Sequence, residues 1–360
     1  MNTNLKQFFP ILWEKTELLD KINADRYLSA TFYKWTLEQQ EYFIDCCTGV
    51  RGMKLLYDGF FKEIMNAEYT PERLDEFLSL LLQKKVRVHT VLPNDSTRIA
   101  DESSLLITDL VVELDDGSLA NVEIQKIGYN FPGQRSACYS ADMLLRQYKR
   151  IRSLKKKKFN YRDIKDVYII VLFEQSTSEF HRFPNNYLHY FCQRSDTGLE
   201  LDLLQKFIFV ALAIFRKNQH NKIINTKLDA WLLFLSSDDP EDILRLISEY
   251  PEFRAMYEQA YAMCRNLEEI MGFFSEELRI LDRNTVQYMI DEMQEKIDEM
   301  NDTISNLQEE IDDKQFELDE KQSQLDEKQS QLDEKDLLLQ KQQQRLEDLE
   351  HQITKLKNNL

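Results

Sequence analysis

The hydrophobic pattern between residues 86 and 173 predicts a β-sheet. Four segments rich in β-branched and apolar residues are typical of strands, at residues 86–92, 105–114, 118–125 and 167–173. Apolar residues at helical spacing predict helices at residues 54–66, 71–84 and 132–153. The order is therefore helices, three strands, a helix and a strand, which favours an α/β fold with a mixed sheet flanked by helices.

A seven-residue repeat runs through the C-terminal part of the chain. Ile or Leu recurs at every seventh position from Ile290 to Leu360, which is typical of a coiled-coil seam. The second core position is apolar at both ends of the repeat, but in the middle it is polar, at Lys314, Lys321, Lys328, Lys335 and Gln342. We predict a coiled coil that joins subunits into a homodimer or homo-oligomer. A single solvated helix with Glu and Lys pairs is the alternative.

The segment between the predicted sheet and the seven-residue repeat also shows the signals of helices. The stretch SSDDPEDILRLISEY, from Ser236, has capping residues, a proline near the first turn and then apolar spacing, so it predicts a helix start. The run FIFVALAIF, from Phe207, has no clear period and is interpreted as core. We predict four parts: a helical lead-in (1–49), an α/β domain (50–217), a helical extension (218–283) and a coiled coil (284–360).

Composition narrows the class of protein. With 42% hydrophobic residues and only 8 Gly and 7 Pro, the chain should be folded and rich in helix. Its five cysteines are odd in number and form no CxxC pair, which indicates reduced thiols and argues against a zinc site. The N-terminus lacks the pattern of a signal peptide, and the longest apolar run is shorter than the roughly 20 residues of a membrane helix. We expect a soluble, cytoplasmic protein without membrane contacts.

The charge is unevenly distributed. The formal net charge is −17, of which −12 lies in residues 284–360, where 9 Lys and Arg face 21 Asp and Glu. Residues 1–283 therefore carry only −5. The acidity of the whole chain does not argue against a nucleic-acid partner for its first part.

Two carboxylates interrupt the apolar strands of the stretch TDLVVELDDGSLANVEIQK, which begins at Thr108. The turn Asp115-Asp116-Gly117 tolerates a positive φ and is a suitable centre for a hairpin. A hairpin centred on Asp116 places Asp109 directly opposite Glu123. The alternative is a pairing shifted by one residue, with one of the two carboxylates facing solvent.

The face of the second strand is also informative. Asn121 and Gln125 share the face of Glu123, whereas Val122 and Ile124 point the other way. Opposed like charges destabilise a strand pair unless something positive lies between them. Mg²⁺, held by carboxylate oxygens, a backbone carbonyl and waters, is the simplest such cation.

The same stretch resembles the motif core of the PD-(D/E)XK nuclease superfamily, in which an aspartate before a β-turn and a Glu-x-Lys after it build the metal site. It is most similar to the branch of PD-(D/E)XK nuclease family transposases, or recombination-promoting nucleases, in which Gln replaces the lysine. Three spaced motifs match, at Glu123-Ile124-Gln125, at Asp58, Phe61 and Lys62 (Asp-x-x-Phe-Lys), and at Arg135 and Tyr139 (Arg-x-x-x-Tyr). The resemblance covers roughly residues 50–215.

The resemblance implies a PD-(D/E)XK restriction-endonuclease-like core and a Mg²⁺-dependent endonuclease acting on DNA, with Mn²⁺ as an alternative ion. Asp109 and Glu123 would be metal ligands, and the carbonyl of Ile124 a third. Gln125 would stand in the place of the lysine that orients the attacking water or stabilises the developing charge. An amide positions water but supplies no positive charge, so Arg135 or Lys126 is the candidate for that charge.

A basic segment follows the predicted helix at residues 132–153. Seven of the ten residues from Lys149 onward are cationic, namely Lys149, Arg150, Arg152, Lys155, Lys156, Lys157 and Lys158. Tyr148, Phe159 and Tyr161 are interleaved with them. Such a segment is where a nuclease would contact DNA phosphates, together with Arg135 and Tyr139. The alternative is a solvated helix end whose cations complement the helix dipole.

Two functions from different classes follow from these patterns. The first is a metal-dependent DNA endonuclease associated with transposition or recombination. The second is a catalytically weak or inactive nuclease fold, retained as a DNA-binding or scaffold protein that oligomerises through its coiled coil. The pair of Asp109 and Glu123 favours the first, and the replacement of Lys by Gln125 favours the second.

Overall fold

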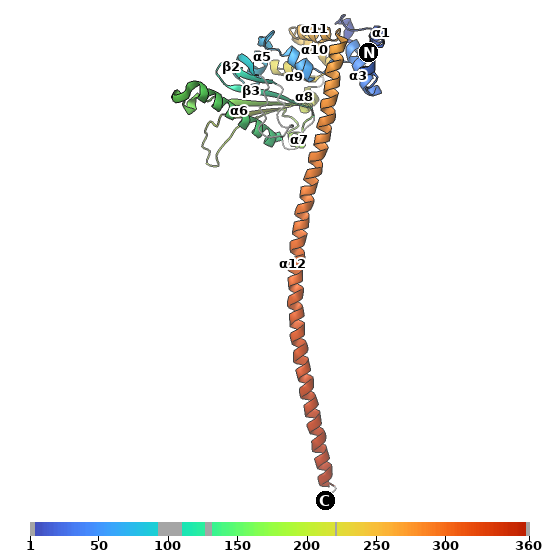
Figure 1. Ribbon diagram of the computed structural model, residues 1–360, viewed down its shortest axis with the longest axis vertical. Helices are drawn as coiled ribbons and strands as arrows, with labels where there is room; N and C mark the ends of the chain where they lie inside the picture. Colours follow the sequence, from blue (N-terminus) through green and yellow to red (C-terminus); the bar gives the residue numbers. More distant parts are fainter. Residues whose placement is uncertain (1–3, 93–109, 127–131, 220–221, 358–360) are drawn as a thin grey trace. The chain divides into compact units, whose positions relative to one another are not determined.

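The computed structural model describes residues 4–92, 110–126, 132–219 and 222–357, and it divides into two compact units, Met1–Met289 and Ile290–Leu360. The first unit is built around a six-stranded sheet (Figure 1). Its strands are β1 (Val88–Leu92), β2 (Leu110–Leu114), β3 (Leu119–Gln125), β4 (Val167–Phe173), β5 (Leu188–Phe191) and β6 (Gln205–Ala211).

The sheet is mixed, as the order of predicted elements indicated. Its strand order is β1-β2-β3-β4-β6-β5. The central strands β3, β4 and β6 are parallel, whereas β1 and β2 on one side and β5 on the other pair antiparallel with their neighbours. The carboxyl ends of the three parallel strands therefore lie along one edge of the sheet, which is where α/β folds commonly place their sites.

Helices make up most of the remaining described chain. They are α1 (Lys15–Ala24), α2 (Arg26–Phe32), α3 (Leu37–Thr48), α4 (Asp58–Ile64), α5 (Pro71–Leu81), α6 (Pro132–Lys155), α7 (Ser178–His181), α8 (Leu212–Gln219), α9 (Lys227–Ser236), α10 (Pro240–Glu249), α11 (Phe253–Met263) and α12 (Leu267–Lys357), with 3₁₀ turns η1 (Leu5–Gln7), η2 (Lys156–Lys158) and η3 (Tyr161–Asp163). The described helices include none that is both long and apolar enough to cross a membrane.

Most predicted elements are confirmed, but two strands were missed. The apolar run at Phe207 was interpreted only as core, but it forms β6 and the start of α8. A parallel strand buried on both faces is a continuous apolar run, so it shows no alternation. The edge strand β5 was not predicted, because it is only four residues long. Residues 105–109 of the predicted second strand lie outside the described residues.

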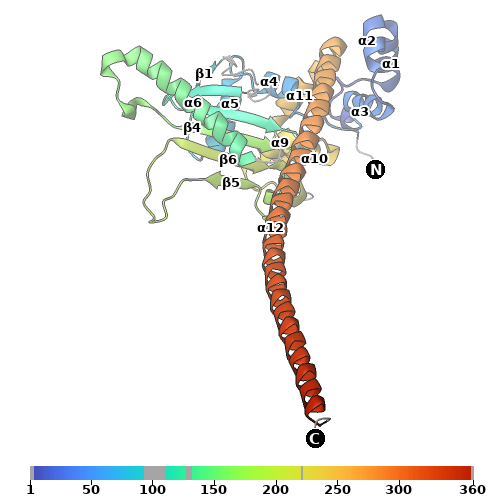
Figure 2. The ribbon, with the colours of Figure 1, turned by 60° about the horizontal axis from the view of Figure 1, so that its bottom comes forward.

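The sheet separates two hydrophobic cores. On one face, Val122 and Ile170 pack into the larger core, which is shared with α4, α5, α9 and α11. The other face is covered by α6 (Figure 2). There Val171 and Phe209 share a smaller core with Tyr139 and Met143 of α6. The alternation of side chains along β3 and β4 thus assigns successive residues to different cores.

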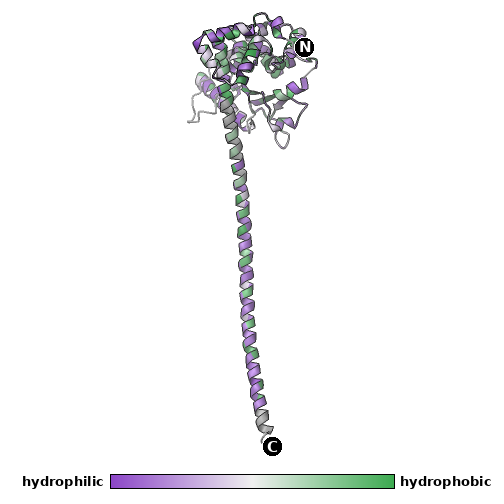
Figure 3. Ribbon diagram, turned by 90° about the vertical axis from the view of Figure 1, so that its right-hand side faces the viewer, coloured by the Kyte–Doolittle hydropathy of each residue, from purple (hydrophilic) through white to green (hydrophobic). Residues whose placement is uncertain are grey.

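The first part of α12 belongs to the larger core. Phe274 packs edge-on against Phe43 and Tyr57, with ring centroids 5.0 and 5.5 Å apart. Further along α12, apolar and polar residues alternate (Figure 3), and the seam residues of the seven-residue repeat that the structure describes, such as Leu318 and Leu325, are exposed. The predicted long helix is confirmed. Its pairing into a coiled coil stays a prediction.

Gly59 gives a test of how closely α4 packs on α12. A Cβ built on Gly59 would lie 2.5 Å from the ring of Phe273, whereas one on Gly272 meets nothing within 4 Å. We expect Gly59→Ala to lower the free energy of unfolding by about 1–3 kcal/mol, because the ring must move. The control, Gly272→Ala, should raise it by up to about 1 kcal/mol through helix propensity. Equal urea midpoints for the two variants would contradict the packing.

Candidate functional site

The hairpin has the predicted register. Leu110 pairs with Val122 and Val111 with Asn121. Gly117 adopts a φ of 85°, and the N–H of Leu114 donates to the carbonyl of Ser118 at 2.8 Å. The turn is therefore centred where the sequence placed it, since only a residue such as glycine adopts this conformation without strain. Asp109 lies outside the described residues.

Three polar side chains of β3 lie on the face covered by α6. Asn121, Glu123 and Gln125 are all buried, with exposed fractions of 0%, 3% and 2%. Gln125 donates from Nε2 to Oε1 of Glu123 at 3.1 Å. Val122 and Ile124 are on the opposite face, as the alternation of the strand predicts. A sheet face that would ordinarily be apolar thus carries a carboxylate and two amides.

The first turns of α6 bring a cation to this face. The Nε of Arg135 lies 3.6 Å from Oε1 of Glu123, and its guanidinium lies over the ring of Tyr139, 5.4 Å from the centroid. The sequence offered both Arg135 and Lys126 as the nearby positive charge. Lys126 points to the other face, where its ammonium pairs with Glu277 at 3.1 Å. Arg135 is therefore the cation that the described structure places against Glu123.

Burial makes Glu123 an unusual carboxyl. Its removal from water raises its pKa, and the nearby Arg135 and the hydrogen bond from Gln125 only partly oppose this. In the described part of the chain, Oε2 of Glu123, Oε1 of Gln125 and both polar atoms of the Asn121 side chain have no hydrogen-bond partner. Buried polar atoms are normally satisfied, so these oxygens are candidates for binding something further.

The set of buried oxygens fits a hard divalent cation. Carboxylate and amide oxygens with backbone carbonyls and waters are the ligands that Mg²⁺ takes. Within the described residues no three His, Cys, Asp or Glu side chains gather, so a site here would need ligands beyond Glu123. The described part of β2 begins at Leu110, which pairs with Val122. Asp109 precedes Leu110 in the chain, and the sequence predicts that it supplies the second carboxylate.

The Asp-x-x-Phe-Lys residues lie on α4. Asp58 pairs with Lys62 at 2.7 Å, and Phe61 is buried in the larger core. Lys62 also lines a cavity of about 380 Å³, together with Leu110 and Val111 at the start of β2. The structure thus brings the lysine of this motif to the start of β2, rather than to Glu123. Glu63, on the same helix, is exposed.

The basic segment is remote from Glu123. Arg135 and Lys155 are separated by twenty residues of α6, which at 1.5 Å per residue is roughly 30 Å. Arg150 forms a two-pronged pair with Glu113 at 2.6 and 2.8 Å, and Lys155 pairs with Asp163 at 2.6 Å. The other cations of the segment are exposed, namely Lys149, Arg152, Lys156, Lys157 and Lys158.

Comparison with models of protein families shows to which family the chain belongs. Residues 55–289 match the model of the PD-(D/E)XK nuclease family transposase. The chain belongs to this family. The match runs from just before α4 to the end of the first compact unit, so the family unit includes the helices after β6 and the first part of α12. No curated protein and no solved structure matched the chain.

Membership of the PD-(D/E)XK nuclease family transposases confirms the resemblance seen in the sequence, and it supports a nuclease or transposase-related function. Sequence reasoning missed one group of charged residues: Lys54, which lies just before the matched range, and Glu174 and Glu277 within it. Lys54 pairs with Glu174, and Glu277 pairs with Lys126, at the carboxyl ends of β3 and β4. Nothing in the sequence singles them out, because charged side chains usually face solvent.

Proposed function

We propose that this chain is a metal-dependent DNA endonuclease associated with transposition or recombination. The observation that carries the proposal is the pairing of Glu123 with Arg135 and Gln125 on a buried strand face. A carboxylate is costly to bury even when it is paired, and structural cores rarely keep one without a function. The oxygens without partners around it support a ligand at this point.

Each residue has a role in this proposal. Asp109 and Glu123 hold Mg²⁺ or Mn²⁺, with the carbonyl of Ile124 as a third ligand. When bound, the metal ion supplies Lewis-acid polarisation of the phosphodiester and a more acidic water. Gln125 positions the attacking water by hydrogen bonding. Arg135 provides positive charge beside Glu123, which offsets the missing lysine of the main superfamily pattern.

DNA is the proposed substrate and partner. Arg135 and Tyr139 lie at the site, and the exposed cations at the far end of α6 lie where they can bind the phosphate backbone, because backbone charge dominates affinity for DNA. Arg150 and Lys155 already have carboxylate partners. We therefore assign the phosphate contacts to Lys149, Arg152, Lys156, Lys157 and Lys158.

A second function is supported by one specific observation. Gln125 occupies the place of the superfamily's lysine, and its amide has no charge. The fold could then act as a catalytically weak or inactive DNA-binding scaffold. Nicking of supercoiled plasmid in Mg²⁺, in Mn²⁺ and in EDTA separates the two functions. Metal-dependent nicks support the nuclease, and tight DNA binding without nicks in either metal supports the scaffold.

Self-association through residues 284–360 completes the proposal. One active site cuts one strand, so two subunits are needed to cut both strands of a duplex at once. The seam residues Leu325 and Leu332 are exposed in the single chain, with exposed fractions of 62% and 56%, so a partner helix can cover them.

Changing the seam should separate nicking from double-strand cleavage. We expect Leu325→Glu with Leu332→Glu to convert the chain to a monomer in light scattering, and to reduce linearisation of plasmid at least tenfold while nicking persists. Ser323→Glu with Ser330→Glu adds the same charge on the outer face of the repeat and should leave the dimer intact. A monomeric native chain would contradict the coiled coil.

A further inference from the structure

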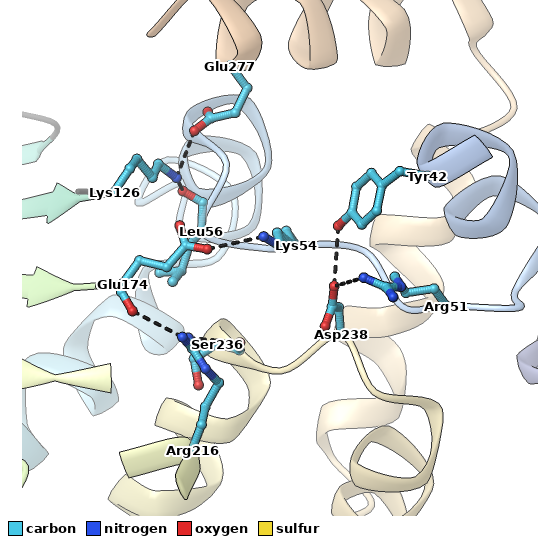
Figure 4. A network of polar contacts seen from close by, with 10 residues as sticks. All are labelled: Tyr42, Arg51, Lys54, Leu56, Lys126, Glu174, Arg216, Ser236, Asp238 and Glu277. Carbon is cyan, nitrogen blue, oxygen red and sulfur yellow. Dashed lines mark hydrogen bonds and ion pairs between the residues drawn. The ribbon is translucent and has the colours of Figure 1, made fainter. Parts of the chain in front are cut away.

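Four charged side chains meet at the carboxyl ends of β3 and β4 (Figure 4). They lie on the side of the larger core, opposite to the face of Glu123. Lys126 pairs with Glu277 of α12 at 3.1 Å, and Lys54 pairs with Glu174 at 3.2 Å. The two pairs come from four separate parts of the chain: the segment before α4, the ends of two strands, and α12. They connect the first part of α12 with the edge of the sheet that bears the candidate site.

The pair of Lys126 and Glu277 is inside the protein. Their side chains are only 6% and 2% exposed, so water and salt screen the pair very little. Lys126 also donates to the carbonyl of Leu56, and the N–H of Asp58 donates to Oε2 of Glu277 at 3.3 Å. Glu277 therefore holds both the residue that follows β3 and the first residue of α4.

Lys126 is the residue next to the candidate site in the sequence. It follows Gln125, whose carbonyl accepts a hydrogen bond from the N–H of Glu174 at 2.8 Å. Arg216 in turn donates to the carbonyl of Glu174 at 3.0 Å. The backbone at the end of β3 is thus bonded to Glu174, the residue after β4. The side chain of the next residue, Lys126, is paired with Glu277 of α12.

We propose that Glu277 is a positioning residue for the site on β3. It holds Lys126 and thereby sets the position of Gln125 and Glu123, and it makes α12 a part of the nuclease machinery rather than a neighbouring support. The inference rests on the proposed nuclease function for its catalytic readout. Because Asp58 is held by the same carboxylate, Glu277 also aligns the motif helix α4 with the strand.

A purely stabilising role explains the pair less well. Two ions taken out of water lose about as much solvation as their attraction returns, so buried ion pairs are often neutral for stability relative to apolar residues of similar size. What such a pair adds is a defined geometry. Two apolar side chains at these places could slide, whereas an ammonium that pairs with a carboxylate and donates to a carbonyl is held in place.

Glu277→Gln is the direct test, because it keeps the shape of the side chain and removes its charge. We expect at least a tenfold lower kcat for plasmid nicking, an unchanged KM for DNA, severalfold weaker Mn²⁺ binding in calorimetry, and faster amide exchange at residues 123–126. The control is Glu276→Gln, one position earlier on the exposed side of α12, which should match the native chain in all four measurements. Native kcat and native Mn²⁺ affinity in a folded Glu277→Gln protein would overturn the proposal.

A double variant covers the case in which Glu277→Gln fails to fold. Lys126→Met with Glu277→Met removes both charges, so no lone ion is left in the core and the protein should unfold near the native temperature. We expect the same loss of kcat and Mn²⁺ affinity in this variant. Native values there would overturn the proposal. If the native chain does not cut DNA, the nuclease function fails, while Mn²⁺ affinity and amide exchange still test Glu277.

Discussion

Replacing Glu123 with Gln should abolish metal-dependent cleavage without weakening the fold. The side chain keeps its size and can still accept a hydrogen bond, but it loses the charge that would bind the metal and pair with Arg135 at 3.6 Å. We expect nicking in Mg²⁺ or Mn²⁺ to fall at least about 100-fold, the scale seen when one preorganised electrostatic contact is removed. The control is Glu63→Gln on the exposed side of α4, which should cut plasmid at the native rate.

The stability of the same variant gives an independent check. Burial raises the pKa of Glu123 above its ordinary 4.5, so the folded protein binds that proton more tightly than the unfolded chain does. The native protein therefore loses stability as the pH rises through 4.5 and the raised value. In EDTA, Glu123→Gln should be as stable as the native protein at acid pH and more stable at neutral pH.

Added Mg²⁺ or Mn²⁺ should make the native protein more stable than Glu123→Gln at neutral pH. An ion that binds only the folded native chain raises its midpoint of unfolding, and it should leave that of Glu123→Gln unchanged. Cleavage that survives in Glu123→Gln would mean that β3 is not the catalytic strand. A loss of cleavage accompanied by a lower midpoint in EDTA would mean that Glu123 has a structural role.

The part of the site that lies on the hairpin was predictable from neighbouring residues alone. The Asp-Asp-Gly turn determines the register of the hairpin, because only position 117 adopts a positive φ there. The register and the alternation of β3 then place Asn121, Glu123 and Gln125 on one face. Both steps use only neighbouring residues, and both are confirmed for the described part of the hairpin. The predicted contact of Asp109 with Glu123 stays a prediction.

Tertiary relations were not predictable from the sequence. Lys126 follows Gln125 along the chain, and nothing local shows that its ammonium pairs with a carboxylate 151 positions away, at Glu277. The distance between Arg135 and the basic segment could not be predicted either, because it depends on α6 continuing as one helix from Pro132 to Lys155. Strand β6 was missed for a related reason, since burial on both faces removes the alternation that reveals a strand.

The basic segment should control DNA affinity and not the rate of cutting. Lys156, Lys157 and Lys158 are exposed, and they lie beyond the far end of α6, whose N-terminal turns hold Arg135 against Glu123. We expect replacement of all three by Gln to flatten the dependence of log K on log salt by about 2–3, because each lost phosphate contact removes about 0.9 from the slope. Nicking at saturating DNA should keep its native rate.

The matched control removes the same charge elsewhere. Lys15, Lys21 and Lys34 are exposed in the N-terminal part of the chain, and their replacement by Gln should leave the salt slope unchanged. An equal effect of both triple variants would mean that net charge, and not a local contact, attracts DNA. A slower rate at saturating DNA in the first variant would mean that the segment reaches the cut site. DNA would then have to bend along α6, because the helix keeps the two groups roughly 30 Å apart.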